Sequence, residues 1–182
     1  MSFESVPVTE ERAQALLAEY FDYRRATFPV AEGYVVNLPD PAKFTPPAGE
    51  FVIALDEARA PLGCGGVRRL ADDVLGGEPR RVWEVKHLWV RETGRGRGTG
   101  RSLLAELERR AAAFGADTVV LDTNASLVAA NGLYSSSGYV PIPPYNDNGN
   151  ATTWFRKDLT GARTAAPQAD PCAARQAGAP GR

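Results

Sequence analysis

A glycine-rich run at residues 95–100, RGRGTG, is the part of this sequence best suited to binding an anion. It lies between a short apolar segment and an amphipathic one, so it is expected to join a strand to a helix. The first N–H groups of a helix have no intrahelical partner, and the helix dipole is positive at that end. Glycine lets a ligand approach the backbone closely, and Arg95, Arg97 and Arg101 add positive charge. The run therefore favours a pyrophosphate ligand, and a solvated basic turn is the alternative interpretation.

Two common phosphate-binding motifs do not fit this run. A Walker loop requires Lys and then Ser or Thr after its last glycine, whereas Arg101 and Ser102 follow here. A dinucleotide-binding fingerprint requires Gly-x-Gly-x-x-Gly, but the glycines alternate with other residues throughout 94–100. The spacing that does fit is Arg-x-x-Gly-x-Gly, which starts at Arg95.

The segments on either side of the loop predict the elements that hold it. Residues 82–90 are rich in β-branched and aromatic side chains, which is typical of a strand. After the loop, apolar residues recur at helical spacing up to Phe114, and Gly115 is suited to end that helix. Residues 117–122 form a second short apolar run. A strand, a helix and a strand of these lengths predict a βαβ unit whose two strands are parallel neighbours.

The remaining elements follow from the same kinds of pattern. Thr9 is predicted to cap a helix that ends before Pro29. Gly63, Gly65 and Gly66 predict a bulge or a close approach in the second strand of a hairpin. The other expected elements are strands at 3–8, 50–55, 62–70, 139–142 and 151–159, a short helical turn at 40–44, and a helix at 126–137.

The loop and the strand before it resemble the acyl-CoA pyrophosphate loop of the GCN5-related N-acetyltransferase (GNAT) family. A second signature agrees, because Leu133-Tyr134 followed by Ser-Gly-Tyr at 137–139 resembles the Leu-Tyr and Gly-aromatic pairs of that family. The order of elements over residues 50–159 also matches. Residues 139–157 resemble a group of small bacterial GNAT proteins with a Pro-Tyr-Asn-Asp segment before a Trp-Phe-x-Lys strand. The resemblance implies an α/β fold, with a central mixed sheet, a splayed parallel pair and helices on both faces.

The same resemblance implies acetyl-CoA as co-substrate and predicts which residues hold it. Its pantetheine arm would enter the gap between the splayed strands, where a backbone N–H could also bind the thioester oxygen. Many family members place an Asn about two turns before the Tyr, but Leu127 stands there, so Asn124 or Asn131 is the candidate substitute. The predicted cofactor-binding residues are Leu88, Trp89, Val90, Arg95, Gly96, Arg97, Gly98, Thr99, Gly100, Arg101, Ser102, Asn124 and Asn131.

Two residues are predicted to carry the catalysis. By the resemblance, Tyr134 would lie near the sulfur as general acid, and a core tyrosine is the alternative interpretation. Glu84 is the candidate base, because a charged residue in a central strand must face a cleft or be paired. Pairing of Glu84 with Lys86 or with an arginine is the alternative. Tyr145, Asn146 and Asp147 are expected at the acceptor side, or simply in a turn.

Strand alternation decides which side chains accompany the base. Side chains at 84, 86, 88 and 90 are expected on one face, and those at 83, 85, 87 and 89 on the other, more apolar face. A bulge in this strand would shift that parity. Under strict alternation, His87 is a packed structural histidine rather than a base.

Composition bounds the class of protein. The chain has 182 residues with a formal net charge of −1, which predicts one domain over residues 1–159, and residues 160–182 have the composition of a disordered tail. The charge balance gives no reason to expect a nucleic acid or membrane partner, and no signal-peptide pattern is present, so a cytoplasmic location is predicted. Cys64 and Cys172 indicate neither a disulfide framework nor a metal site.

The sequence favours an enzyme that transfers an acetyl group from acetyl-CoA to a primary amine of a small molecule or peptide, by direct attack in a ternary complex. The first alternative is a non-catalytic acyl-CoA-binding or regulatory module, and the second is a protein that binds another phosphate ligand. Loops at 30–49, 71–81 and 141–150 are expected to shape the acceptor site, although they do not name the amine. A homodimer is compatible with the sequence, but no stretch demands one.

Overall fold

The computed structural model describes residues 1–30 and 33–159, so the predicted tail lies outside the described residues. The predicted elements are confirmed, and η2 is an additional one. Glu10 rather than Thr9 caps the first helix, since its side chain accepts from the N–H of Ala13. The elements in chain order are β1 (Ser2–Ser5), α1 (Glu11–Thr27), η1 (Pro41–Phe44), β2 (Gly49–Leu55), β3 (Pro61–Arg69), β4 (Val82–Val90), η2 (Glu92–Gly94), α2 (Thr99–Ala113), β5 (Thr118–Thr123), α3 (Val128–Ser136), β6 (Val140–Ile142) and β7 (Thr153–Asp158).

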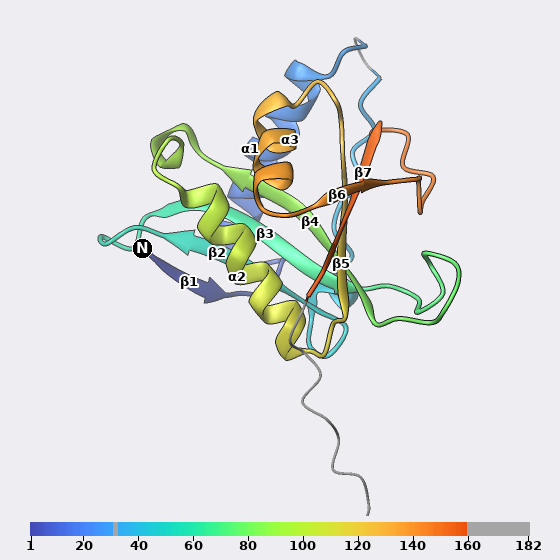
Figure 1. The fold of residues 1–182 in the computed structure, drawn as a ribbon. Helices are drawn as coiled ribbons and strands as arrows, with labels where there is room; N and C mark the ends of the chain where they lie inside the picture. The colour runs from blue at the N-terminus through green and yellow to red at the C-terminus, as the bar shows by residue number, and fades with distance from the viewer. Residues whose placement is uncertain (31–32, 160–182) are drawn as a thin grey trace, which may run out of the picture.

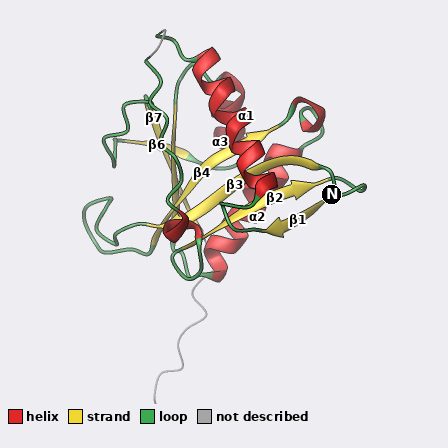
Figure 2. Cartoon of the chain, turned by 180° about the vertical axis from the view of Figure 1, so that it is seen from behind, coloured by secondary structure: helices red, strands yellow, loops and turns green. Residues whose placement is uncertain are grey.

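The strands form one mixed sheet in the order β1-β2-β3-β4-β5-β7-β6, in which only β4 and β5 are parallel neighbours. Helix α2 covers one face of this sheet and α1 covers the other (Figures 1 and 2). Each face has its own buried cluster. Leu103, Leu104 and Leu107 of α2 pack on one face, and Leu16 and Leu17 of α1 pack on the other. The predicted mixed sheet with helices on both faces is confirmed.

The two parallel strands separate soon after they pair. Strand β4 is paired with β3 from Trp83 to Val90, but with β5 only from Val82 to Glu84. Past that point the side of β4 that faces β5 has no strand partner. An ion pair between Lys86 Nζ and Asp122 Oδ1, 2.7 Å long, bridges the gap. The splay that the sequence predicts is therefore present.

A bulge interrupts β4 at His87 and changes the predicted parity. Cys64 pairs with Trp89 and Gly66 with Lys86, so two steps along β3 correspond to three along β4. His87 has a positive φ of 55°, which accommodates the extra residue. On β3, a Cβ at Gly65 would lie 2.8 Å from Leu107 Cδ1, which explains the predicted close approach.

Strict alternation along β4 is therefore wrong past Lys86. Leu88 packs with the cluster of Trp83 on the α2 side, and Val90 contacts the start of α2. His87 and Trp89 instead face α1, on the same side as Glu84. The bulge thus turns the apolar end of the strand toward the splayed gap.

His87 is a packed histidine, as predicted, but it packs against α1 and η1. Its ring lies 5.9 Å from that of Tyr20 and 5.8 Å from those of Phe21 and Phe44, measured between centroids. Burial, reinforced by the positive charge of Lys86 and of a neighbouring arginine, lowers the pKa of His87 to about 3. The imidazole is therefore neutral at physiological pH.

The lowered pKa of His87 predicts a pH-dependent stability difference from His87→Asn, a variant whose side chain tolerates positive φ. The unfolded chain binds a proton near pH 6.5 and the native chain only near pH 3, so acid destabilises the wild type through this residue. The unfolding free energy of the wild type relative to the variant should fall by about 2–3 kcal/mol between pH 7.5 and pH 4.5. Urea denaturation at several pH values measures this, and a constant difference would contradict the prediction.

Candidate active site

The predicted phosphate-binding loop connects η2 to α2. Gly96 and Gly98 have φ values of +72° and +79°, and no atom lies within 4 Å of the position that a Cβ would take at either. No side chain caps the helix, and its first backbone bond runs from Ser102 N–H to the Gly98 carbonyl at 3.0 Å. The preceding N–H groups are therefore directed into open space at the positive end of the helix, where an anion can bind.

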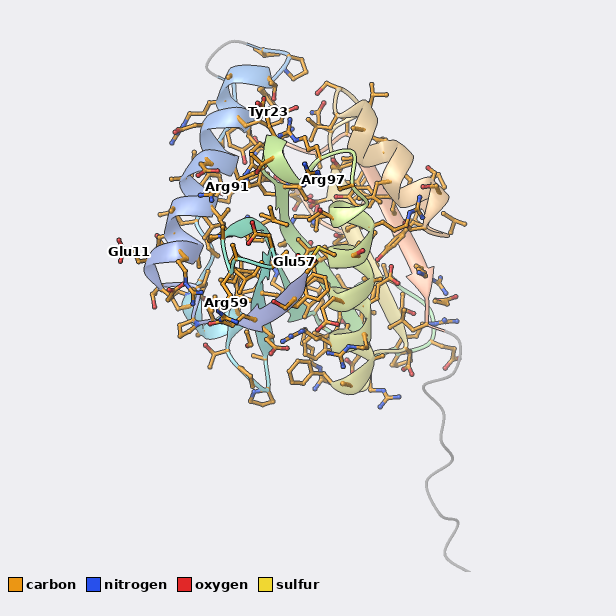
Figure 3. All side chains as sticks on the ribbon, turned by 90° about the vertical axis from the view of Figure 1, so that its left-hand side faces the viewer. Glu11, Tyr23, Glu57, Arg59, Arg91 and Arg97 are labelled. Atoms are coloured by element: carbon orange, nitrogen blue, oxygen red, sulfur yellow. The ribbon has the colours of Figure 1, made fainter. Side chains whose placement is uncertain are left out.

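The arginines of this region differ in whether their guanidinium groups contact other residues of the protein. Arg95 lies with its guanidinium 4.8 Å from the ring centroid of Trp89 and 5.3 Å from that of Tyr23. Arg101 binds the C-terminal end of α3 through two hydrogen bonds of 2.8 and 3.1 Å. Arg97 is exposed at the start of α2 and makes no hydrogen bond or ion pair with any described residue (Figure 3). Arg95 and Arg101 therefore shape the loop, and Arg97 is free to meet a phosphate.

A cavity of about 370 Å³ lies beside the splayed strands. Its apolar wall comes from β4 and from the α3 region, with Val85, Leu88, Leu127, Ala130 and Tyr134. Its opposite wall comes from α1, the loop at 33–39, η1 and the loop between β6 and β7. The cavity has the size of a small-molecule site, and it receives side chains from both faces of the splay.

Tyr134 presents a hydroxyl to this cavity. The residue is only 6% exposed, and its ring packs against those of Tyr139 and Phe155. Its hydroxyl makes no hydrogen bond with any described residue. Burial, with a smaller contribution from the charge of Asp122, raises the pKa of Tyr134 well above its usual range. Tyr134 is therefore protonated at neutral pH and has a proton to donate.

Glu84 is paired on every side. It is 0% exposed and does not line the cavity. Its Oε2 accepts from Arg68 Nε at 2.7 Å, and its Oε1 accepts from the Tyr145 hydroxyl at 2.8 Å. Lys86 Nζ lies 3.2 Å from Oε1. This geometry corresponds to the ion-paired alternative of the sequence analysis, and the role of Glu84 as base stays a prediction.

A second carboxylate, Asp122 on β5, is held by the segment that precedes β7. It accepts from Lys86 at 2.7 Å, from Asn146 at 2.8 Å and from Asn148 at 3.1 Å. Burial alone would raise the pKa of Asp122, but the charge of Lys86 and these hydrogen bonds outweigh it and lower the pKa. Of the three residues expected at the acceptor side, Asn146 lines the cavity, whereas Tyr145 and Asp147 do not, and their role stays a prediction.

One side-chain amide joins two segments that line the cavity, the loop at 33–39 and the segment before β7. Asn150 Oδ1 accepts from Val35 N–H at 3.0 Å, and its Nδ2 donates to the Val35 carbonyl at 2.6 Å. The amide therefore pairs with the loop at 33–39 as a neighbouring strand would. This clamp holds two segments that are 115 residues apart in the sequence against each other over the cavity.

The sequence model of the acetyltransferase (GNAT) family matches residues 12–139, a region that contains the loop, the splayed strands and Tyr134. The chain belongs to this family. Acetyl transfer from acetyl-CoA is its general chemistry.

Two relatives show how far the similarity extends. An uncharacterized N-acetyltransferase from Schizosaccharomyces pombe is 35% identical over 106 residues, which cover 58% of this chain and 61% of that protein. An IAA acetyltransferase from Azospirillum brasilense is 29% identical over 134 residues, covering 74% of this chain and 80% of that protein. The matched region therefore spans less than two thirds of the yeast relative.

Solved structures share the GNAT fold at low sequence identity. A GNAT-family acetyltransferase from Staphylococcus aureus superposes with a TM-score of 0.66 at 15% identity, covering 87% of this chain and 99% of that one. A phosphinothricin acetyltransferase from Sinorhizobium meliloti, solved in complex with AcCoA, gives 0.60 at 18% identity, covering 92% of each chain. At this identity the comparison supports the fold and not a shared acceptor.

The two asparagines that were predicted to replace the missing GNAT asparagine are already engaged within the protein. Asn124 donates to the Asn150 carbonyl at 3.1 Å and accepts from Ser126 N–H at 3.0 Å. Asn131 donates to the carbonyls of Asn124 and Leu127, both at 2.9 Å. Neither amide lines the cavity, whereas Leu127 does. Their hydrogen bonds close the turn before α3, and a role for either asparagine as a cofactor ligand stays a prediction.

Sequence reasoning missed Arg24, which is 4% exposed and lines the cavity from α1. A signal was present, because position 24 continues the apolar stripe of Leu17, Tyr20 and Phe21 at helical spacing. A charged residue on the buried stripe of a helix requires a partner or a site.

Within the described residues, no helix is both long and apolar enough to cross a bilayer. Over the same part of the chain, no group of three or more His, Cys, Asp or Glu side chains is arranged to hold a metal ion.

The pairing of Glu84 predicts that Glu84→Gln loses stability. Removing one charge leaves Arg68 and Lys86 with a single buried carboxylate, so the unfolding free energy should fall by about 2–4 kcal/mol. Urea denaturation measures it, and Glu57→Gln, an exposed control (Figure 3), should change it by less than about 0.5 kcal/mol. Unchanged stability together with lost acetyl transfer would instead identify Glu84 as the base.

Proposed function

We propose that this GNAT acetyltransferase transfers the acetyl group to a primary amine of a small molecule or peptide, by direct attack within a ternary complex. The observation that carries the proposal is the cavity beside the splayed strands, into which Tyr134 presents an unbonded hydroxyl. The free helix N-terminus at Gly98 marks the donor end. A cavity that meets both a donor site and a proton donor supports transfer better than storage of a cofactor.

The residues present fit acetyl-CoA. The N–H groups at Thr99 and Gly100 and the side chain of Arg97 would hold the pyrophosphate. A Cβ at Gly100 would lie 3.5 Å from Leu133 and 3.7 Å from Val90, so the helix start meets the wall of the splay. The pantetheine arm would follow that wall toward Leu88. When bound, acetyl-CoA supplies the activated thioester.

The reaction requires one residue that donates a proton to the leaving sulfur and another that accepts a proton from the amine. As the C–N bond forms and the C–S bond breaks, Tyr134 would donate its hydroxyl proton to the departing sulfur. A backbone N–H of β4 near Leu88 would stabilise the negative charge that develops on the thioester oxygen. The amine loses a proton in the same reaction, and Glu84 is the sequence-derived candidate to accept it, through Tyr145 or Lys86, which contact its carboxylate.

The rival function is a non-catalytic acyl-CoA-binding or regulatory module. It uses the same loop and splay, so it shares every expectation about cofactor binding. It differs in predicting no turnover with any amine and no effect of Tyr134 substitution beyond stability.

Acetyl-CoA should bind with a micromolar dissociation constant, about −8 kcal/mol, and ATP should bind far more weakly. Gly98→Glu should abolish this binding, because its carboxylate would stand where the pyrophosphate is expected. Isothermal titration calorimetry measures both.

Gly77→Glu is the matched control for the loop variant. Gly77 also has a positive φ, of 75°, with no atom near the Cβ position, so this substitution adds similar backbone strain and the same charge in a distant loop. It should bind acetyl-CoA normally. No binding by the folded wild type would overturn the proposal.

Tyr134→Phe should lower kcat by at least about 100-fold and leave acetyl-CoA affinity unchanged, because only the proton donor is lost. Tyr139→Phe serves as control, since Tyr139 is a buried tyrosine that packs against Tyr134 but does not line the cavity. Steady-state release of CoA measures kcat. Equal rates for both variants would exclude Tyr134 as the acid.

A further inference from the structure

Arg24 is a buried cation that has no anionic partner among residues 1–30 and 33–159. It is 4% exposed, it lines the cavity, and its Nη1 is fully buried with no hydrogen-bond partner. It forms no ion pair with any described residue. Burying a cation away from an anionic partner is costly, so this position favours a ligand of opposite charge.

The contacts that Arg24 does make do not replace an anion. Its guanidinium carbon lies 5.2 Å from the ring centroid of Tyr34 and 5.8 Å from that of Phe28, and the residue is in the last turn of α1. Aromatic faces and a helix C-terminus both favour a cation. Neither accepts an N–H hydrogen bond as an anionic oxygen does, so the buried Nη1 of Arg24 has no acceptor among the described residues.

The charges around the cavity leave a surplus of one positive charge. Arg68 is paired with Glu84, and Lys86 is paired with Glu84 and Asp122. These two cations and two anions balance. Among the charged side chains that the structure describes around the cavity, Arg24 is therefore the cation without a paired anion, and a ligand of opposite charge would complete the site.

Resting on the proposed function, we infer that the acceptor is a small primary amine that carries a carboxylate, and that Arg24 binds this carboxylate. A planar guanidinium matches a carboxylate with two parallel hydrogen bonds. The neighbouring rings of Tyr34 and Phe44 would enclose the carbon skeleton of the acceptor.

The geometry places the two ends of such an acceptor in one cavity. Arg24 and Tyr134 both line it. The positive charge of Arg24 lowers the pKa of Tyr134, whereas burial raises it. An amino acid held by its carboxylate at Arg24 would therefore direct its amine toward β4, where the thioester is expected. A volume of about 370 Å³ suits a molecule of amino-acid size.

The test compares common amino acids with their amides as acceptors, because each pair differs in charge and hardly in shape. The full-length protein with acetyl-CoA should show kcat/KM at least 100-fold higher for the best amino acid than for its amide. Arg24→Met should reduce that ratio to below 5, and Arg24→Lys should retain part of it. Equal use of acids and amides by the wild type, or an unchanged ratio in Arg24→Met, would overturn the inference.

Arg25→Met is the matched control, since Arg25 is the next residue of the same helix but is exposed and paired with Asp22. It should keep the wild-type ratio. Thermal unfolding without ligand gives a readout that is independent of activity. Arg24→Met should unfold at the same temperature as the wild type or higher, because an unsatisfied buried charge is removed. A large decrease would show that Arg24 has a structural partner.

Glu32 lies outside the described residues and is tested directly as that partner. A double-mutant cycle of Arg24→Met and Glu32→Gln in thermal unfolding should show no coupling. Strong coupling would assign the carboxylate to Glu32 and overturn the inference.

Two further experiments distinguish a failure of this inference from a failure of the proposed function. Succinyl-CoA replaces acetyl-CoA, and a preference for it that Arg24→Met removes would place the carboxylate on the donor instead, against the inference. Calorimetry with acetyl-CoA is run on the same samples. Absence of that binding would refute the proposed function, whereas normal binding with neither binding nor turnover of any amino acid would refute the inference alone.

Discussion

The separation of β5 from β4 is the constraint on which the site depends. After three paired residues the two parallel strands diverge, although β4 stays paired with β3, across the bulge, as far as Val90. Unpaired backbone groups in a protein interior are costly, so such a gap persists only if it is lined, filled or bridged. Here α3 supplies Tyr134, the bulge at His87 turns Leu88 toward the gap, and α2 begins where the strand ends. The fold thus leaves backbone groups of β4 unpaired, and a ligand with its own hydrogen-bonding groups can pair with them.

Ion pairs and hydrogen bonds connect the two strands across the gap. Lys86 lies between Glu84 on β4 and Asp122 on β5, and the segment before β7 binds both carboxylates through Tyr145 and Asn146. Burying any one of these groups without its partners costs free energy, so the arrangement is stable only when all of them are present. This network therefore joins β4, β5 and the segment before β7 to one another. A residue that the network needs for stability does not have to take part in the reaction.

The sequence was sufficient for what depends on local patterns. Periodicity and glycine spacing predicted every described element but η2, and they placed the loop at 95–100 between a strand and a helix. It was insufficient where partners are distant. Alternation could not reveal the bulge at His87, which depends on the room that Gly65 leaves under α2. The amides of Asn124 and Asn150 are used by segments far away in the chain, and no local pattern shows that they are already occupied.

This difference has a physical basis in how the two halves of the site are built. The donor half consists largely of backbone, whose N–H groups are fixed by the start of a helix and by the end of a strand, so a short motif describes it. In the proposed function, the acceptor half consists of side chains that α1, two loops and β4 bring together around Arg24. A substitution at position 24 changes the charge offered to the acceptor and leaves the donor backbone untouched. Acceptor choice can therefore diverge among GNAT proteins while the loop that binds the donor stays recognisable.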